Sequence, residues 1–407
     1  ALEKARKVFE NLPTRDVVAW SALISGYAQH GHGTDALECF QQMQETGVRP
    51  NAVTYICILK ACGIVGSLHI GENIDIEVRK QGLLHKHVVL GAALVDMYSK
   101  CGMLEKAQEV FEQLPVRNVG SWNALIAGYA QNGLGDEALR CLKQMQDVGV
   151  QPDPVTYICI LKACGSVGSL QIGEDIDAEV RKQGLLQKDV VLGTALVDMY
   201  SKCGALEKAR EVFELLPMQT VVSWNALITG YVHHGLGDEA LKCLIQMQNV
   251  GVCPDAITYI CILKACAVVG CLEIGEGIDV EVRKQNLLQR DVVLGTALVD
   301  MYSKCGAMEK ARAVFKQLPN KNIVTWNALI TGYAQLGQAN VVLDLYRTMR
   351  TEGVVPNLVT FIVLLTACSH AGLVKEGERL FDEMCSLSCL TPNLEHYTCM
   401  IDLFGRA

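Results

Sequence analysis

The chain of 407 residues is half hydrophobic and one fifth charged, a composition that supplies a buried core and excludes a disordered chain. Its 36 basic and 44 acidic residues give a net charge of −8, which argues against the overall basic surplus of most nucleic-acid binders. No apolar run approaches the ~18 residues of a membrane span, so we expect no membrane partner. The first residues, "ALEKARKVFENLP", carry no signal or transit pattern, and localisation cannot be read from them.

Four tryptophans mark a long internal repeat. They are the only ones in the chain, each lies 102 residues after the last, and they stand at Trp20, Trp122, Trp224 and Trp326. A fixed period of this length points to a repeat array, which can run to any length as one continuous structure. We therefore expect one elongated domain where length alone would suggest two or three.

The long unit divides into three shorter repeats of 35, 36 and 31 residues. A partial repeat over 1–16 comes first. The full repeats then span 17–51, 52–87, 88–118, 119–153, 154–189, 190–220, 221–255, 256–291, 292–322, 323–357 and 358–393, and a truncated repeat covers 394–407.

Each repeat has the pattern of a helix, a turn and a second helix, as in 119–153. We expect Ser121 to accept a hydrogen bond from an amide of the first turn, and Asn132 with Gly133 to end the first helix. The second helix should begin near Asp136 and end before Gly149, with one apolar face. Because neither helix can bury its apolar stripe alone, neighbouring pairs must stack. The expected fold is all-α, a right-handed superhelical α-solenoid with a long groove.

The 18 cysteines follow the same period, and thirteen of them are copies of four positions. Small thiols at helical spacing in apolar surroundings usually serve as packing residues, and so many of them suit a reducing compartment. One local cluster consists of Cys385, Cys389, His396 and Cys399. Its spacing suits zinc only loosely and it spans an expected helix end and loop, so we expect no metal ligands and no cofactor.

The repeat endings carry a family resemblance. "GVRPN", "GVQPD", "GVCPD" and "GVVPN" close the 35-residue repeats, and "NALITGY" stands near the start of two of them. With the three lengths, these motifs resemble pentatricopeptide repeats of the plant P, L and S classes. "LKACGSVGSL" resembles the L class, and "ALVDMYSKCGALEKAREVF" resembles the S class. "LTACSHAGLVKEG" and "TPNLEHYTCMIDLFGRA" resemble the last repeats, L2 and S2, that precede a C-terminal extension in organelle RNA-editing factors.

By this resemblance the 35-, 36- and 31-residue repeats are of P, L and S type, 1–16 is a partial S repeat, 358–393 is L2 and 394–407 is a truncated S2 repeat. The family implies binding of single-stranded RNA, one base per repeat, with the protein N-terminus toward the RNA 5′ end. The implied role is the target-recognition array of a C-to-U editing factor in a mitochondrion or chloroplast. Other editing-complex proteins would be further partners, and we expect the natural protein to continue into an extension.

In the family, the fifth residue of a repeat reads the base together with the last residue. The pairs here are Ser21 with Asn51, Ala92 with Asn118, Asn123 with Asp153, Thr194 with Thr220, Asn225 with Asp255, Thr296 with Asn322, and Asn327 with Asn357. An asparagine amide offers a donor and an acceptor to a pyrimidine edge, whereas a shorter hydroxyl leaves room for a purine.

By the family pattern the two Asn–Asp pairs prefer U, the pairs of Ser21 and Thr296 prefer A, and the Asn–Asn pair prefers C over U. Ala92 has no hydrogen-bonding side chain, and Thr194 with Thr220 is not a standard pair. The L repeats have isoleucine at the fifth position and are expected to act as spacers; these residues are Ile56, Ile158, Ile260 and Ile362. The expected site is 5′-A-N-N-U-N-N-U-N-A-Y-N-3′.

The family also places an apolar residue at the second position, against the face of the base. Val18, Val222 and Val324 fit this role, whereas Gly120 does not, so the repeat that holds Asn123 should hold its base less firmly. Because the net charge is negative, basic residues must cluster locally along the groove if the chain binds RNA.

Two other classes of function are alternatives to RNA recognition. A tetratricopeptide-like protein-binding scaffold shares paired helices and a groove, but its repeat has 34 residues and a different consensus. A cytidine deaminase needs H-x-E and C-x-x-C, and none of the nine histidines is followed two places later by glutamate, while C-x-x-C does not occur. We therefore expect no catalytic residues in this chain.

Overall fold

The structure, a computed structural model, describes residues 2–386 and 390–406. The chain divides into two units, Ala1–Met218 and Gln219–Ala407, and each is described by itself. Over the described residues every regular element is a helix. None of these helices has the length and apolar character needed to cross a membrane.

The helices of the first unit are α1 (Leu2–Glu10), α2 (Val17–Gln29), α3 (Gly33–Glu45), α4 (Ala52–Val65), α5 (Leu68–Lys80), the short 3-10 helix η1 (Leu83–His85), α6 (Val88–Lys100), α7 (Leu104–Glu112), α8 (Val119–Gln131), α9 (Gly135–Asp147), α10 (Pro154–Val167), α11 (Leu170–Lys182), α12 (Val190–Lys202) and α13 (Leu206–Glu214).

The helices of the second unit are α14 (Val221–His233), α15 (Gly237–Asn249), α16 (Ala256–Val269), α17 (Leu272–Lys284), the 3-10 helix η2 (Leu287–Gln289), α18 (Val292–Lys304), α19 (Met308–Gln317), α20 (Ile323–Gln335), α21 (Ala339–Thr351), α22 (Leu358–Ala371), α23 (Val374–Ser386) and α24 (Leu394–Arg406).

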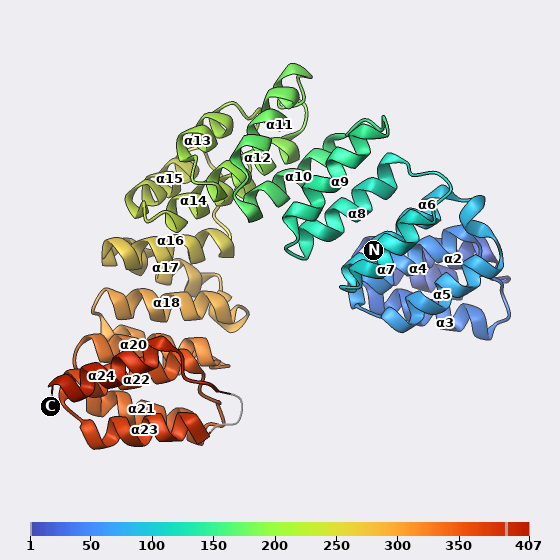
Figure 1. The fold of residues 1–407 in the computed structure, drawn as a ribbon. Coiled ribbons are helices and arrows are strands. Elements are labelled where there is room, and N and C mark those ends of the chain that lie inside the picture. The colour runs from blue at the N-terminus through green and yellow to red at the C-terminus, as the bar shows by residue number, and fades with distance from the viewer. Residues whose placement is uncertain (1, 387–389, 407) are drawn as a thin grey trace. The chain divides into compact units, whose positions relative to one another are not determined.

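Both units are built as two layers of helices (Figure 1). The even-numbered helices, here called the first helices, pack one against the next: α2 to α12 in the first unit and α14 to α24 in the second. The odd-numbered helices, or second helices, from α3 to α11 and from α15 to α23 each pack against the first helix of their own pair and against the first helix that follows. Helix α1 packs against α2, and α13 packs against α12. The predicted all-α solenoid of paired helices is therefore confirmed.

The first helices begin at a polar residue that caps them. Before α8 the cap is Asn118, whose Oδ1 accepts a hydrogen bond from the backbone amide of Ser121 at 2.9 Å. The prediction that Ser121 caps this helix is wrong, because Ser121 is the third helical residue and its hydroxyl donates to the Asn118 carbonyl at 2.8 Å. Helix α8 ends at Asn132 and Gly133, as predicted, and Gly133 takes the left-handed conformation that favours glycine, with φ of +77°.

The core lies between the two layers. Three of the tryptophans are buried on first helices and meet a phenylalanine of the preceding second helix edge-on, with ring centroids 4.5 to 4.7 Å apart. Cys62, Cys164 and Cys266 are fully buried, and this burial raises the pKa of each thiol to about 12. These cysteines are protonated at neutral pH and serve as packing residues, as expected.

Candidate nucleic-acid interface

The stacking of first helices brings together residues that lie about 30 positions apart in the chain. Asn123 is the fifth residue of α8, and Asp153 is the N-cap residue of α10, the next first helix. Their side chains are hydrogen-bonded, with Asn123 Nδ2 donating to Asp153 Oδ1 at 2.9 Å. A fifth helical residue and the N-cap of the following first helix therefore form one compact polar site.

A threonine completes this site. The hydroxyl of Thr156, the third residue of α10, donates to Asn123 Oδ1 at 2.6 Å, and its backbone amide donates to Asp153 Oδ1 at 2.8 Å. Asn225, Asp255 and Thr258 repeat the arrangement in the second unit, at 3.0 Å for the amide–carboxylate bond and 2.6 Å for the hydroxyl–amide bond. We call each such set an Asn–Asp–Thr triad.

The third asparagine site has an amide in place of the carboxylate. Asn327 Nδ2 donates to Asn357 Oδ1 at 3.2 Å, and the Thr360 hydroxyl donates to Asn327 Oδ1 at 2.9 Å. The three asparagines at the fifth position are 8 to 9% exposed, so each site is open to solvent only at one edge. At this edge lie the polar groups that take no part in the hydrogen bonds within the site.

Those remaining groups differ between the sites. In the Asn–Asp–Thr triad one N–H of the asparagine amide and one oxygen of the aspartate have no partner among the described residues, which makes one donor and one acceptor. Asn357 uses its Oδ1 internally, so the site of Asn327 presents an N–H from each of its two amides.

The aspartates are ionised. Burial alone would raise the pKa of Asp153, but hydrogen bonds from the Thr156 backbone amide, the Asn123 amide and the Thr156 hydroxyl outweigh burial and hold the pKa below its ordinary value. The equivalent groups of Thr258 and Asn225 lower the pKa of Asp255. At neutral pH both carboxylates therefore act only as acceptors.

Shorter side chains at the fifth position make a looser connection. Ser21 Oγ lies 2.7 Å from the Thr54 hydroxyl, which in turn donates to Asn51 Oδ1 at 3.0 Å. Thr296 Oγ1 lies 2.7 Å from the hydroxyl oxygen of Thr325, and this hydroxyl donates to Asn322 Oδ1 at 3.0 Å. Over the described part of the chain no hydrogen bond joins the fifth residue directly to the N-cap at these two sites.

The other two predicted pairs differ from these sites. Ala92 offers no polar group, and Asn118 acts as a helix cap. Thr194 belongs to the first unit and bonds to the Val190 carbonyl at 2.8 Å, whereas Thr220 belongs to the second unit and caps α14.

Comparisons with known proteins agree with these repeats. The profile of the "PPR repeat family" matches residues 15–63, 117–166, 219–268 and 321–370, and the profile "PPR repeat" matches 93–119, 194–218, 296–323 and 359–389. Together they cover more than half of the chain. The chain belongs to the pentatricopeptide repeat family.

Two relatives from Arabidopsis thaliana carry this family name. The chloroplastic pentatricopeptide repeat-containing protein At1g11290 is 36% identical over 406 residues, which are 100% of this chain and 50% of that protein. The putative pentatricopeptide repeat-containing protein At3g05240 is 34% identical over 414 residues, covering 100% of this chain and 73% of that protein. The chain thus spans about half of the first relative.

A solved structure shares the fold. The crystal structure of the pentatricopeptide repeat protein PPR10 from maize aligns with a TM-score of 0.55 and 18% sequence identity, over 99% of this chain and 69% of that one. PPR10 in complex with an 18-nt psaJ RNA element aligns with a TM-score of 0.52, at 18% identity, over 96% of this chain and 71% of that one.

Pentatricopeptide first helices here also expose an aliphatic side chain at the second helical residue. Val18, Val222 and Val324 are 58 to 67% exposed. Sequence analysis missed the same feature on the other first helices, where the exposed residues are Val53, Val89, Val155, Val191, Ile257, Val293 and Val359. The signal was available, because a branched aliphatic residue stands one place after the start of each of these helices.

Positive charge on the first helices is sparse. Lys60, Lys162 and Lys264 are exposed and lie one helical turn after the fifth residues of α4, α10 and α16, which places them on the same helix face. Within the described residues none of the three forms an ion pair. The lysines of α6, α12 and α18 are instead paired with an aspartate four residues earlier, at 2.7 to 2.9 Å.

The local cluster of cysteines and histidine near the C-terminus is described only in part. Over residues 2–386 and 390–406 no group of three or more potential ligands could hold a metal ion, and Cys389 lies outside the described residues. His396 is fully buried and is occupied in the helix cap, where its ring nitrogens lie 2.5 Å from Asn393 Oδ1 and 3.1 Å from the Leu358 carbonyl oxygen.

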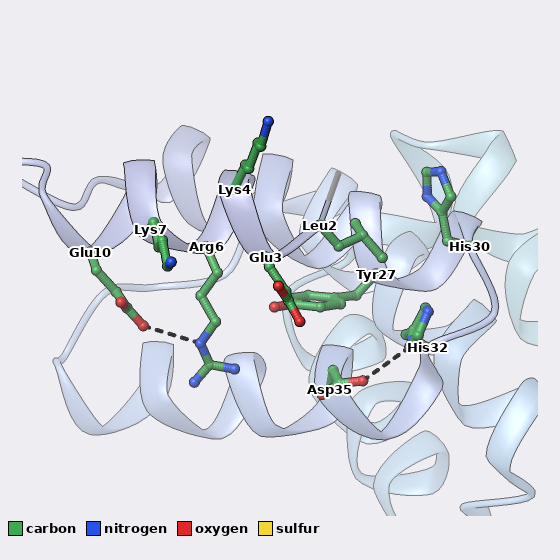
Figure 2. A pocket seen from close by; sticks show the side chains of 10 residues that line it. All are labelled: Leu2, Glu3, Lys4, Arg6, Lys7, Glu10, Tyr27, His30, His32 and Asp35. Atoms are coloured by element: carbon green, nitrogen blue, oxygen red, sulfur yellow. Dashed lines mark hydrogen bonds and ion pairs between the residues drawn. The ribbon is translucent and has the colours of Figure 1, made fainter.

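A pocket of about 860 Å³ lies between α1, the end of α2 and the start of α3 (Figure 2). Two ion pairs lie among its lining residues: Arg6 pairs with Glu10 at 3.2 Å, and His32 with Asp35 at 3.4 Å. Hydrogen bonds that Arg6 donates to Tyr27 and Glu10 raise the pKa of Arg6. None of the predicted base-reading residues lines this pocket, so we assign it no part in recognition.

Proposed function

We propose that the chain binds single-stranded RNA in a sequence-specific manner, with one base per repeat and the protein N-terminus toward the RNA 5′ end. The observation that carries the proposal is the recurrence of the Asn–Asp–Thr triad, which presents the same donor and acceptor at equivalent places in both units. The fold shared with PPR10, a protein solved in complex with RNA, supports it.

The donor and acceptor of the triad match uracil. Its N3–H can donate to the free carboxylate oxygen of Asp153, and an adjacent carbonyl oxygen can accept from the free N–H of Asn123. Cytosine has a lone pair at N3, which the carboxylate would repel. The repeats that hold Asn123 and Asn225 should therefore prefer U over C.

The site of Asn327 matches cytosine. Its two amide N–H groups can donate to N3 and to the carbonyl oxygen of the base, both of which are acceptors in cytosine. Uracil offers a donor at N3 and would leave one amide unsatisfied, so C is preferred over U. At the sites of Ser21 and Thr296 the shorter side chain leaves more room, which suits the larger adenine that the family pattern assigns.

The exposed aliphatic residues supply contact with the base faces. Stacking or packing on a base is worth roughly 1–3 kcal/mol in single-strand binders, so these residues should provide much of the affinity. The isoleucines at the fifth position of α4, α10, α16 and α22 cannot discriminate by hydrogen bonds and act as spacers. The expected target is 5′-A-N-N-U-N-N-U-N-A-Y-N-3′.

The wider role we propose is target selection for C-to-U RNA editing in a mitochondrion or chloroplast, with the L2 and S2 repeats closing the P, L and S series. Relatives whose names read chloroplastic or mitochondrial support the location. The deaminase chemistry would come from outside this chain, from a C-terminal domain or another editing-complex protein. Transcript sequencing from plants lacking the protein tests this: a cytidine on the 3′ side of a matching site should stay unedited, and unchanged editing would contradict the role.

The binding proposal is tested by fluorescence anisotropy of the purified chain with labelled RNA of the expected sequence. We expect tight binding that weakens when either U is replaced by C or A. Equal binding to a shuffled oligonucleotide would contradict base reading. A lack of binding to any RNA would contradict the proposal as a whole and favour a protein-binding scaffold.

A further inference from the structure

The third residue of the first helices is a buried hydroxyl residue at seven places. Five are threonine and two are serine, all with no exposed surface: Thr54, Ser121, Thr156, Ser223, Thr258, Thr325 and Thr360. The ordinary role of a hydroxyl residue at this position is to stabilise the start of its own helix, because it forms hydrogen bonds with the N-cap residue three places earlier. At three of these sites, however, the hydroxyl also reaches the base-reading asparagine of the preceding first helix.

We infer that Thr156, Thr258 and Thr360 are positioning residues that set which face of the asparagine amide meets the base. This inference rests on the proposed function. None of the three would touch RNA, because each side chain is fully buried beneath the asparagine that it contacts.

The direction of the hydroxyl proton carries the argument. Thr156 Oγ1 accepts a hydrogen bond from the backbone amide of Asp153 at 3.0 Å. Two acceptors lie within reach of its single proton, Asn123 Oδ1 at 2.6 Å and Asp153 Oδ1 at 3.0 Å, and the shorter distance assigns the proton to Asn123. A hydroxyl held in this way acts as a fixed donor to the asparagine.

The amide of Asn123 lies between the donating hydroxyl of Thr156 and the carboxylate of Asp153, and these two neighbours allow it only one orientation. The oxygen of Asn123 must face Thr156, and its nitrogen must face Asp153, where it donates at 2.9 Å. The remaining N–H then points out of the site. An amide turned by half a rotation would bring its oxygen against the carboxylate and would present an acceptor to the base, which inverts the preference.

Ser121 provides an internal comparison for Thr156. Ser121 occupies the same third position in α8, but the fifth residue of the preceding first helix is Ala92, which has no amide to orient. The Ser121 hydroxyl donates instead to the Asn118 backbone carbonyl at 2.8 Å. The third residue thus reaches the preceding first helix where a polar fifth residue stands there, as with Asn123, Ser21 and Thr296, and it orients an amide only where that residue is asparagine.

The test replaces the hydroxyl by a methyl group of the same shape. Thr156→Val, Thr156→Ser and the wild type are titrated with RNAs that carry U or C opposite the repeat of Asn123. We expect the ratio of the affinity for the RNA with U to the affinity for the RNA with C to fall roughly tenfold in Thr156→Val. Thr156→Ser should retain the wild-type ratio. Thr258→Val should act in the same way on the base opposite Asn225.

Ser121→Ala is the matched control. It removes a buried hydroxyl at the same third position of a first helix, so both Ser121→Ala and Thr156→Val should lower the temperature of thermal unfolding, whereas only Thr156→Val should change base selectivity. If Thr156→Val and Thr258→Val keep the wild-type ratio of U to C, the inference is overturned and the proposed function stands. A wild-type chain with no preference between U and C at these positions would overturn the proposed function and the inference together.

Discussion

In the proposed function, the carboxylate of Asp153 is the group that separates uracil from cytosine at the triad of the first unit. Four hydrogen bonds, from the Thr156 backbone amide, the Asn123 amide, the Thr156 hydroxyl and the Val155 backbone amide, hold its pKa below the ordinary value of 3.8. A depressed pKa means that the carboxylate stays ionised, with its stabilising bonds intact, until the pH falls below that value. The U preference should therefore be the same at about pH 6 and pH 8.

Asp153→Asn tests this assignment. Asparagine also serves as the N-cap at equivalent sites, so the fold should survive, but the free acceptor becomes a donor. We expect the preference at this position to change from U to C by about tenfold, as measured by competition binding. The reverse change, Asn357→Asp, should turn a C preference into a U preference. Retention of U by Asp153→Asn would refute the role of the carboxylate.

Gly120 leaves one base without an aliphatic contact. A Cβ at this residue would meet only Asn118 Oδ1, at 3.5 Å, so a larger side chain is tolerated. Gly120→Val should tighten RNA binding by about 1 kcal/mol, because it supplies the base contact that we propose for Val222 in the second unit. Val222→Gly is the complementary variant and should weaken binding by a similar amount. Unchanged affinity in both variants would remove the second helical residue from the interface.

Single residues were predictable from the sequence only where they follow a known pattern. The partners Asn123 and Asp153 came from the family resemblance, and the structure joins them by a hydrogen bond. Thr156 was missed because it reads as part of a local cap, three residues after Asp153. Its contact with Asn123, 33 residues earlier, depends on the packing of α8 against α10, which no local pattern encodes.

At the scale of helices, glycine allows two first helices to approach closely. A Cβ added to Gly128 of α8 would lie 2.5 Å from Ser99 Cβ of α6, so the two helices would have to separate. Gly128→Ala should lower the free energy of unfolding by about 1–3 kcal/mol, as measured by urea unfolding. Gly26→Ala is the control, since its nearest neighbour would be Leu2 Cδ2 at 3.6 Å. Equal stability of the two variants would mean that α6 and α8 are not so tightly packed.

Helix ends were easier to predict than helix beginnings. Gly133 and Gly149 follow their helices in the left-handed conformation, as their positions in the sequence suggested. The start of α8 was misassigned because Asn118 and Ser121 are both good capping residues. Sequence preference cannot rank them, whereas the extended backbone of Asn118, with φ of −84° and ψ of 173°, identifies it as the cap.

At the scale of the whole molecule, the net charge of −8 restricts how the chain can hold RNA. The exposed lysines without ion pairs on first helices, Lys60, Lys162 and Lys264, offer at most three phosphate contacts. Each phosphate contact contributes about −0.7 to the slope of log affinity against log salt for a single strand. Binding should therefore depend only weakly on salt and rely on base contacts.

Replacing Lys60, Lys162 and Lys264 together by glutamine should flatten that slope by about 2. Lys80, Lys182 and Lys284 lie at equivalent places on second helices, and their triple replacement by glutamine changes the net charge equally. This control should leave the slope unchanged. If both triple variants flatten it by the same amount, the lysines act through total charge and do not contact phosphates.

The measurement that tests the central claim most directly is a change of specificity at the first base. Thr54 already stands beside Ser21, so Ser21→Asn with Asn51→Asp should build a third Asn–Asp–Thr triad at this site. In fluorescence anisotropy with RNAs that differ only at their first base, we predict that the wild type prefers A and the double variant prefers U. A double variant that folds and still prefers A, or that binds all four bases alike, would contradict base reading by this pair of residues.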